Sequence, residues 1–588
     1  MRPGKRSPHT ILLTLFALMA MLLAACGGGG NTNSTTQQVV GKASADQQIL
    51  VLPLSGYSDV ATFDPALATE YSAITVINMA FTGLVQLDDH LQVRDELAAS
   101  HSLGSDGLTW TFTLRPNLKF SDGTPLTSAD VAYSIDRALR PDLKSPVAPL
   151  YLGLIKDSDK RNAGQVKTLI GDSILTPNAQ TVVLIANKKA SYFLQTLTYQ
   201  TSYVVEKSMI DKYGDNFADH LSEGIGGDGP FKVDKYVHGK EVDFVPNPNF
   251  FGAQPQVKKV IMPIYQQSDT TYKAYQTNQV DQAPVPVELA AQAKALPNGQ
   301  FHQVPLLELH FYTMNYLVKP FDNIKIRQAF DLALNKDEVA HNIYKDTVIA
   351  TNHIIPTGMP GYNPNLTGPA GVKSTSGDPD QAKKLFQQGL QEEGFTLATL
   401  PPITIETASQ GAAGAKNEYA VAQQTWKTVL GVNVKINDVD QNKLITDRNH
   451  SLNNPNGMQM WALFWGADYP DPQDWMTLIF DKGSTKNGLN YGQNNSSAAA
   501  EQQANQHLME QADVNPDPTS RMQQYNQAEQ QLVNDVAWIP MYQNTTSIVR
   551  KPCVVGITDN AQGFIPQDDW GSIYVSTAAP CANTSQYK

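Results

Sequence analysis

Strand-like and helix-like segments alternate along about 540 residues of this chain, and this alternation restricts the fold more than any other feature. Residues 48–54 form a short apolar run typical of a buried strand, whereas residues 71–81 have the pattern of a helix. Strand-like and helix-like segments continue to alternate as far as residue 542. The alternation predicts an α/β fold. Because the chain is too long for one hydrophobic core, we expect two or three domains.

Residues 108–139 contain the clearest local pattern. Residues 108–114 alternate apolar and polar side chains, which predicts a strand with one buried face. Residues 121–125, Ser-Asp-Gly-Thr-Pro, are typical of a turn. Thr127 and Asp130 have the spacing of a capping box, so a helix is expected to begin there. Its apolar stripe consists of Val131, Ile135 and Leu139.

The same reasoning assigns the remaining main elements. Further strands are expected at residues 231–237, 242–245, 257–264, 307–316, 432–439, 458–465 and 536–542. Further helices are expected at residues 270–277, 326–334, 380–391, 419–430, 498–512 and 520–535. We find no internal repeat.

The N-terminus predicts export. Three basic residues within positions 2–6 precede an apolar run at 11–25, which is too short to span a bilayer of about 30 Å. This pattern is that of a secretory signal, which we assign to residues 1–25. Its exit, Leu-Ala-Ala followed by Cys26, resembles the bacterial lipobox, in which the cysteine is acylated. The alternative is an ordinary signal peptide beside a chance cysteine. Residues 26–47 are rich in small polar residues and are expected to form a flexible tether.

The charge balance excludes some partners. After removal of the signal, the chain has 41 Lys and Arg against 56 Asp and Glu, a net charge of −15. This excess of acid argues against nucleic acid or an anionic membrane surface as a partner. Beyond the N-terminal run, no apolar segment approaches 18 residues, so we expect no further membrane span.

Two cysteines remain after Cys26. Cys553 and Cys581 form an even pair in an oxidising compartment, which favours a disulfide. The alternative is a pair of buried free thiols.

Common catalytic and cofactor motifs are absent from the sequence. It contains no His-Glu-x-x-His, Gly-x-Ser-x-Gly, Cys-x-x-Cys or Walker A motif. Gly224, Gly226 and Gly229 match a dinucleotide fingerprint formally, but Pro230 and a strand follow where that motif requires a helix. We therefore expect neither an enzyme nor a bound cofactor or metal.

Six ordered segments carry a resemblance to a known family. They are Trp110-Thr-Phe-Thr-Leu-Arg115 with Lys119–Val131, Asp228-Gly-Pro-Phe-Lys232 with Asn247–Phe251, Phe311–Asn315 with Lys319–Ala329, Ala382-Lys-Lys-Leu385, Trp465-Gly-Ala-Asp-Tyr-Pro-Asp-Pro472, and Ala537-Trp-Ile-Pro-Met-Tyr542. Over nearly the whole mature chain, the sequence resembles the oligopeptide/dipeptide-binding proteins of ABC importers, family 5 of the extracellular solute-binding proteins.

The resemblance implies a periplasmic-binding-protein-like type II fold with three lobes and a ligand cleft between two α/β lobes. Lobe I is expected at residues 48–88, 201–314 and 546–588. Lobe II is expected as an insertion at 89–200, and lobe III at 315–545. Two chain crossings would form a hinge, and the ligand would favour the closed state.

The resemblance also places the ligand site. In peptide-binding relatives, the aspartate that matches Asp468 pairs with the peptide ammonium; the alternative is a structural aspartate that caps a loop or pairs with an internal cation. Trp465, Gly466, Ala467 and Tyr469 flank it, although the aromatic residues suit a core equally well. Some relatives have a disulfide between this loop and the hinge strand, where this chain has Gly466 and Glu308.

The family places further pocket and hinge residues at Tyr312 and Asn315, and at Tyr71 and Ser72. Alternation puts His310, Tyr312 and Met314 on one face of their strand, and which face meets the cleft stays open.

The expected function is that of a monomeric lipoprotein on the outer face of the cytoplasmic membrane or in the periplasm. It would bind peptides between its lobes and deliver them to the membrane subunits of an ABC permease. One alternative keeps the fold with another solute, such as an oligosaccharide, a nickel chelate, haem or an opine. The other is a surface signalling or processing protein.

Overall fold

The structure is a computed structural model that describes residues 41–224, 226–409 and 411–587. Lys42–Lys588 forms one compact unit. The expected signal peptide, Cys26 and most of the expected tether lie outside the described residues. The folded unit begins before the expected end of the tether, because Ala43 donates a backbone hydrogen bond to Val575 O at 2.9 Å.

The two N-terminal strands pair with the last of three antiparallel strands from residues 231–265, and together they form a five-stranded sheet. Its order is β1-β11-β10-β9, with β2 also paired to β11. The strands are β1 (Ile49–Val51), β2 (Leu54–Ser55), β9 (Phe231–Val237), β10 (Glu241–Pro246) and β11 (Lys259–Tyr265). One apolar core unites this sheet with α2 (Tyr71–Ala80) and α7 (Lys207–Tyr213). The predicted strands at 231–237, 242–245 and 257–264 are confirmed.

Glycines let the segment 227–229 approach the end of helix α2 closely. A Cβ atom at Gly227 would lie 2.2 Å from the carbonyl oxygen of Ala80, and one at Gly229 would lie 2.6 Å from the carbonyl carbon. Between them, Asp228 accepts hydrogen bonds from the backbone nitrogen and Oγ1 of Thr82, at 2.9 and 2.7 Å. Burial raises the pKa of Asp228 to about 7. The motif that begins at Asp228 is thus built around the end of α2.

A four-stranded antiparallel sheet is buried on one face. Its order is β5-β6-β8-β7, with β5 (Ala98–Leu103), β6 (Thr109–Leu114), β7 (Ile174–Asn178) and β8 (Thr181–Ile185). In β6, Trp110, Phe112 and Leu114 are buried whereas Thr113 is exposed, which confirms the predicted one-sided strand. Residues of α3 (Ser128–Ala138) share its core, and the predicted capping box of Thr127 and Asp130 is present. Short helices follow at α4 (Ala148–Tyr151), α5 (Ser158–Asn162) and α6 (Phe193–Thr196).

The third sheet has seven strands and is covered on both faces. Its order is β12-β18-β13-β17-β15-β16, with β14 paired to β18. The strands are β12 (Gln282–Pro284), β13 (Phe301–Met314), β14 (Val348–Ala350), β15 (Thr404–Thr407), β16 (Lys435–Asp438), β17 (Met460–Gly466) and β18 (Ile539–Arg550). Pairing of β15 with β16 and with β17 is parallel, and the other pairings are antiparallel.

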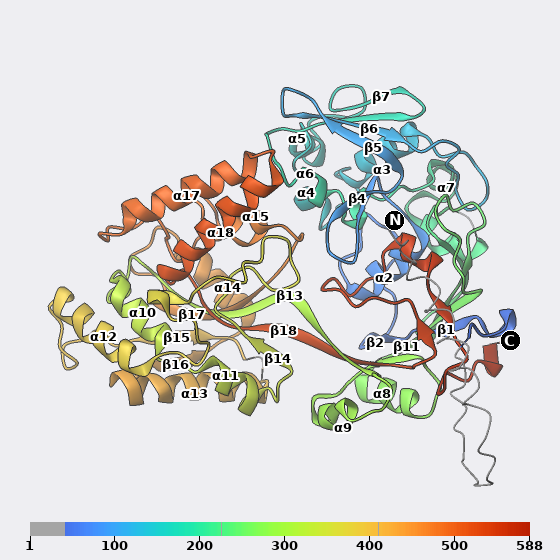
Figure 1. The fold of residues 1–588 in the computed structure, drawn as a ribbon. Helices are drawn as coiled ribbons and strands as arrows, with labels where there is room; N and C mark the ends of the chain where they lie inside the picture. The colour runs from blue at the N-terminus through green and yellow to red at the C-terminus, as the bar shows by residue number, and fades with distance from the viewer. Residues whose placement is uncertain (1–40, 225, 410, 588) are drawn as a thin grey trace, which may run out of the picture. The chain divides into compact units, whose positions relative to one another are not determined.

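Two layers of helices enclose this sheet, as Figure 1 shows. On one face, Met460 and Ala462 share a core with α10 (Ile324–Leu332), α12 (Pro379–Glu393) and α13 (Ala413–Leu430). On the other face, Trp461 and Leu463 share a core with α15 (Pro472–Trp475), α16 (Thr477–Phe480), α17 (Ala499–Val514) and α18 (Pro518–Asn534). Both faces of β17 are therefore buried from Met460 to Leu463, whereas Phe464 is exposed.

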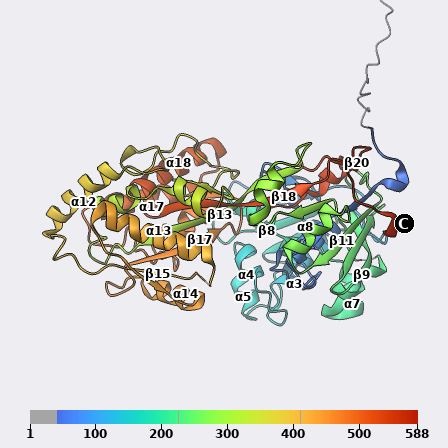
Figure 2. The same ribbon diagram turned by 90° about the horizontal axis from the view of Figure 1, so that it is seen from below.

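The two long strands β13 and β18 connect two separate hydrophobic cores. The 14-residue β13 pairs with the 12-residue β18 from Phe301↔Val549 to Tyr312↔Ile539, with irregular register at two points. Val549 packs with α8 (Ser268–Gln276) and α9 (Ala290–Lys294), whereas Tyr312 and Ile539 pack in the core of the seven-stranded sheet. Figure 2 shows the two strands side by side. They begin or end several residues beyond the predicted 307–316 and 536–542.

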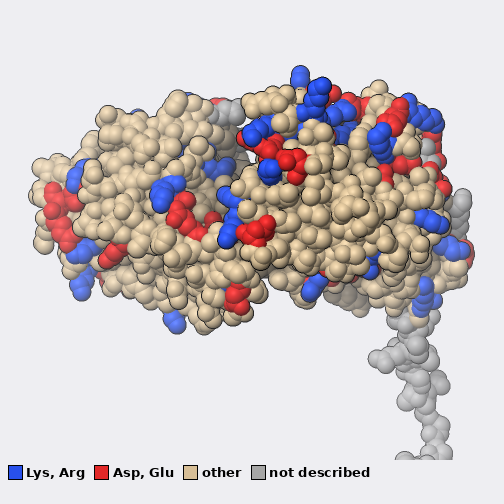
Figure 3. Space-filling model, turned by 90° about the horizontal axis from the view of Figure 1, so that it is seen from above, with Lys and Arg blue, Asp and Glu red and all other residues tan. Residues whose placement is uncertain are grey.

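Small elements complete the described chain: β3 (Val85–Leu87), β4 (Val93–Asp95), α11 (Lys336–Glu338), α14 (Gln441–His450), β19 (Val554–Val555) and β20 (Tyr574–Val575). The three sheets give the α/β class that was predicted, while the lobe boundaries stay a prediction. Within the described residues, no helix combines the length and the apolar character needed to cross a membrane. On the face in Figure 3, basic and acidic side chains lie in small mixed groups.

Candidate functional site

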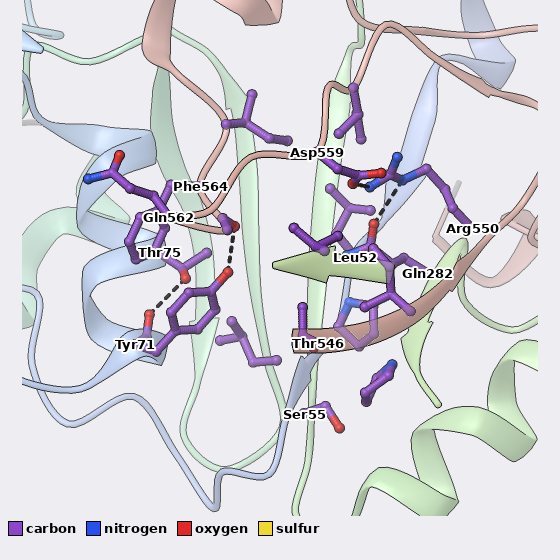
Figure 4. A pocket seen from close by; sticks show the side chains of 18 of the residues that line it. Leu52, Ser55, Tyr71, Thr75, Gln282, Thr546, Arg550, Asp559, Gln562 and Phe564 are labelled. Carbon is purple, nitrogen blue, oxygen red and sulfur yellow. Dashed lines mark hydrogen bonds and ion pairs between the residues drawn. The ribbon is translucent and has the colours of Figure 1, made fainter. Parts of the chain in front are cut away.

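A cavity of about 400 Å³ lies between the start of the chain, strands β12, β13 and β18, and the segment 557–570 (Figure 4). This volume is within the range of small-molecule sites. Its apolar lining includes Leu52, Leu54, Met79, Met262, Val304, Leu306, Ile548, Ile557 and Ile565, and its aromatic lining consists of Tyr57, Tyr71, Phe564 and Trp570. The cavity therefore offers an apolar and aromatic surface to a ligand.

Tyr71 lies on the cavity wall, where it links helix α2 to the C-terminal segment. Its hydroxyl donates a hydrogen bond to Gly563 O at 2.5 Å, and its ring stacks on Phe564 with centroids 4.7 Å apart. The side chain is 44% exposed, so it is accessible to a ligand. Ser72, the next residue, is fully buried and does not line the cavity. Tyr71 therefore lines the cavity, whereas the neighbouring Ser72 is buried in the protein.

The charged groups of the cavity are paired with one another. Arg550 donates hydrogen bonds to Asp559 Oδ1 at 2.5 Å and to Gln282 Oε1 at 2.9 Å (Figure 4). His302 Nδ1 lies 2.7 Å from Asp559 Oδ2. Burial acts to raise the pKa of Asp559, but the hydrogen bonds from His302 and Arg550 lower it overall. This end of the cavity is thus polar but internally neutralised.

The segment 466–474, which we name the acidic loop, follows strand β17 directly. Its Asp468 is half-buried, and its carboxylate has no hydrogen-bond or ion-pair partner among the described residues. Burial raises the pKa of Asp468, and the positive charge of Lys486 opposes this shift. A partly desolvated carboxylate without a partner is suited to bind a cationic group of a ligand.

A second carboxylate holds the acidic loop in position. Asp474 Oδ2 accepts hydrogen bonds from the backbone nitrogen of Asp468 at 3.1 Å and from Trp465 Nε1 at 3.3 Å. Its Oδ1 is buried and has no hydrogen-bond partner among the described residues. Burial, and then the nearby charge of Asp468, raise the pKa of Asp474 well above its ordinary value. Trp465 and Asp468 therefore take their positions partly from Asp474, which lies nine and six residues after them in the chain.

A buried ion pair supports the same loop. Arg521 on α18 donates hydrogen bonds to both oxygens of Asp471, at 2.5 and 2.7 Å, and both side chains are at most 5% exposed. Asp471 also accepts a hydrogen bond from the backbone nitrogen of Gln473 at 3.0 Å, which begins α15. The loop is thereby fixed to the helical layer beneath it.

Tyr469 does not line the cavity and joins the acidic loop to the segment before α6. It is 7% exposed, and its ring stacks on that of Tyr192 with centroids 5.8 Å apart. Next to it, the backbone nitrogen of Ser191 donates to Asp513 O at 2.8 Å. Tyr469 therefore has a packing role in this structure.

Tyr312 and Asn315 are fully buried, and neither lines the cavity. The hydroxyl of Tyr312 donates to Glu418 Oε1 at 2.6 Å within the core of the seven-stranded sheet. Asn315 Oδ1 accepts a hydrogen bond from Asn490 Nδ2 at 2.9 Å. Tyr312 and the Oδ1 atom of Asn315 thus have structural partners, whereas the buried Nδ2 of Asn315 has none among the described residues.

The structure thus groups Trp465, Gly466, Ala467 and Asp468 in one place and Tyr71 in another. Gly466 pairs across the sheet with Glu308. Ala467 continues this contact through a hydrogen bond from its backbone nitrogen to Leu307 O at 2.9 Å. None of the four lines the cavity.

Cys553 and Cys581 are joined by a disulfide, with Cα atoms 5.6 Å apart. The loop that they close contains the cavity residues from Ile557 to Trp570. The disulfide therefore ties down one wall of the cavity. Cys26 is outside the described residues.

Sequence reasoning missed several residues of these two regions. Asp474 falls just beyond the quoted motif that ends at Pro472, and only its hydrogen bonds distinguish it from a surface acid. Lys486, Arg550 and Asp559 had no local pattern to mark them, because their relevant contacts are with residues 9 or more positions away or depend on the fold.

A family model and similar relatives indicate the same family for this chain. Residues 92–487 match the model of the bacterial extracellular solute-binding proteins, family 5 (middle region). The chain is 26% identical to the oligopeptide-binding protein OppA of Bacillus subtilis, over 84% of this chain and 87% of that relative. It is also 26% identical to the periplasmic oligopeptide-binding protein OppA of Salmonella typhimurium, over 88% and 91% of the two chains.

Solved structures with the same fold include the unliganded open form of the murein tripeptide-binding protein MppA. It has a TM-score of 0.77 and 22% identity, and the match covers 92% of this chain and 99% of that one. Haemophilus influenzae OppA in complex with the peptide RPPGFSPFR has a TM-score of 0.60 and 21% identity, over 90% and 99% of the chains. The matched family model covers well over half of the sequence, and its description is of binding proteins rather than enzymes. This chain belongs to the bacterial extracellular solute-binding proteins of family 5.

Proposed function

We propose that this protein is the substrate-binding component of an ABC importer and that it captures di- and oligopeptides. The peptide ammonium pairs with Asp468, and the rest of the peptide occupies the apolar cavity as the lobes close around it. Several relatives support this choice, since they are named oligopeptide- or dipeptide-binding proteins. Two similar structures contain a bound peptide.

The observation that carries the proposal is the state of Asp468. Its carboxylate is half-buried at the end of a covered strand and has no partner among the described residues. Burial of an unpaired carboxylate is unfavourable, so the site gains when a ligand supplies a cation. A peptide has an ammonium at one end of every molecule, which explains how one acid serves peptides of many sequences.

Calorimetry with alanine peptides of two to five residues tests the proposal. Asp468→Ala is expected to weaken binding by about 2 kcal/mol or more, because a charge-assisted hydrogen bond is lost. N-acetylated peptides, which lack the ammonium, should lose a similar amount with the unaltered protein. Asp380→Ala is the matched control, since Asp380 on α12 is 98% exposed. Equal affinity of the folded Asp468→Ala variant would contradict the role of Asp468, and absence of binding to every peptide would contradict the peptide function.

The site of action in this proposal is the outer face of the cytoplasmic membrane or the periplasm. Acylation of Cys26 anchors a monomer there, next to the membrane subunits of its permease. Cys26→Ser is expected to release the protein into the soluble fraction, as measured by fractionation of expressing cells. Retention of the variant in the membrane fraction would contradict the lipid anchor.

An oligosaccharide is the second candidate ligand. The rings of Tyr57, Tyr71 and Phe564 on the cavity wall favour it, because sugars stack on exposed aromatic rings. A thermal-shift screen of the alanine peptides against cello- and xylo-oligosaccharides separates the two ligands, since only a ligand that binds the folded state raises the melting temperature.

A further inference from the structure

The amino group of Lys486 lies beside the acidic loop without a carboxylate partner. Lys486 belongs to the segment between α16 and α17, and its Nζ is 4.6 Å from the centroid of the Trp465 ring. It is half-buried and forms no ion pair with a carboxylate among the described residues. Most partly buried lysines compensate their charge with a nearby acid. Here the face of the Trp465 ring contacts the ammonium, and Asp468 stabilises its charge without forming an ion pair.

A second cation, Arg448, lies beside the segment of Lys486, since a Cβ atom at Gly488 would be 3.1 Å from Arg448 Cγ. The guanidinium of Arg448 on α14 donates hydrogen bonds to Asn449 Oδ1 at 2.8 and 3.2 Å, and it too has no carboxylate partner among the described residues. Burial lowers the pKa of Lys486; Asp468 opposes this shift, whereas Arg448 adds to it. The charges of both Asp468 and Arg448 therefore act on Lys486.

When a ligand ammonium binds to Asp468, the cations beside that carboxylate need another anion. When a ligand ammonium pairs with Asp468, that carboxylate no longer compensates Lys486. Asp474 does not take its place, because its side chain is buried and its Oδ2 already accepts hydrogen bonds from Asp468 N and Trp465 Nε1. The occupied site would then hold two unpaired cations, Lys486 and Arg448, next to the bound end of the ligand.

Building on the proposed peptide function, we propose that Lys486 makes the protein selective for peptides with an acidic side chain at the first or second residue. The carboxylate of that side chain pairs with Lys486 while the α-ammonium pairs with Asp468. A lysine or arginine at the same position is repelled by Lys486 and Arg448. The site therefore selects a peptide end that has both an ammonium and a carboxylate, because it attracts an acidic side chain and repels a basic one.

Calorimetry with four tripeptides tests this selectivity: Glu-Ala-Ala, Ala-Glu-Ala, Ala-Ala-Ala and Lys-Ala-Ala. The unaltered protein is expected to bind the better of the two acidic peptides about tenfold more tightly than Ala-Ala-Ala, and Lys-Ala-Ala more weakly than Ala-Ala-Ala. Added salt should reduce the preference, because a partly exposed charge pair is screened.

Lys486→Met is expected to reduce the acidic preference, measured as the ratio of the affinities for the better acidic peptide and for Ala-Ala-Ala, to less than about threefold. Lys486→Arg keeps the charge and should retain the preference. The matched control is Lys482→Met, four residues earlier, where the exposed lysine pairs with Glu510 at 3.1 Å. Melting temperatures establish that each variant is folded.

The outcomes separate the two proposals. If all four peptides bind the unaltered protein equally, the selectivity is overturned while the peptide function stands. If Lys486→Met tightens binding of every peptide alike, Lys486 is an internal competitor of the ligand ammonium, and the selectivity is again overturned. If no peptide binds, the peptide function fails and this inference fails with it.

Discussion

The cavity and the acidic loop differ in how their charges are satisfied. In the cavity, Arg550, Asp559 and His302 pair with one another, and the remaining surface is largely apolar or aromatic. In the acidic loop, Asp468 and one oxygen of Asp474 have no partner among the described residues. Polar groups that pair internally hold a wall in shape, whereas unpaired groups are available to a ligand.

This difference assigns separate tasks to the two regions. The apolar cavity accepts side chains of many shapes, since apolar contact depends on area rather than direction. The acidic loop fixes the charged end of the ligand, since a charge-assisted hydrogen bond depends on geometry. Such a division gives orientation from one region and tolerance from the other.

The largest expected effect comes from removing one supporting carboxylate in each region and comparing the losses of unfolding free energy. Asp471→Ala leaves Arg521 buried without an acid, which is expected to lower the free energy of unfolding by about 3–5 kcal/mol. Asp559→Ala should cost less, about 1–3 kcal/mol, because Asp559 is 25% exposed and Arg550 keeps its bond to Gln282. Urea unfolding followed by tryptophan fluorescence measures both, with Asp380→Ala as the neutral control. Equal losses would show that the two regions are equally dependent on their ion pairs.

The sequence predicts elements best where one face or one end decides the structure. The strand at 108–114 is correct because a one-sided sheet leaves Thr113 exposed between buried Phe112 and Leu114. The helix after Thr127 begins as predicted because its capping box is local. The disulfide of Cys553 and Cys581 is present in the structure, as favoured over two free thiols.

Prediction fails where long-range contacts decide. Alternation at 307–316 leaves the cleft-facing side open, and in the structure helices cover both faces, so that Tyr312 and Phe311 are equally buried. The length of β18 follows from its pairing with β12, β13 and β14, which no local pattern encodes. The pairing of Arg550 with Asp559 likewise exists only once the C-terminal segment folds back on the cavity.

A fall in pH is expected to distinguish the two regions, because a carboxylate of the acidic loop is protonated at a higher pH than the carboxylate of the cavity. The pKa of Asp468 is raised by burial, so its carboxylate takes up a proton at a higher pH than an ordinary aspartate. Affinity for an ammonium ligand is therefore expected to fall as the pH drops through that raised pKa, by up to about tenfold per pH unit. The pKa of Asp559 in the cavity is lowered instead, so its carboxylate takes up a proton at a lower pH than an ordinary aspartate.

Calorimetry of Ala-Ala-Ala binding between about pH 4 and 7 measures this effect. Asp468→Asn removes the titrating group, so its weaker binding should stay nearly constant over the same range. A parallel fall in affinity for the variant would assign the pH dependence to another group, and the contrast between loop and cavity would lose its electrostatic basis.

Tyr71→Phe gives the smallest expected effect and tests the cavity alone. The variant keeps the ring that stacks on Phe564 but loses the hydrogen bond from the hydroxyl to Gly563 O. Loss of one such bond at a 44% exposed side chain is expected to cost about 0.5–1.5 kcal/mol of unfolding free energy. Because the apolar contact area is unchanged, the affinity for peptides should change by less than about threefold, and the pH dependence set by Asp468 should not change. A larger loss of affinity would mean that the Tyr71 hydroxyl contacts the ligand directly, so that the cavity also contributes directional contacts and the division of tasks between the two regions does not hold.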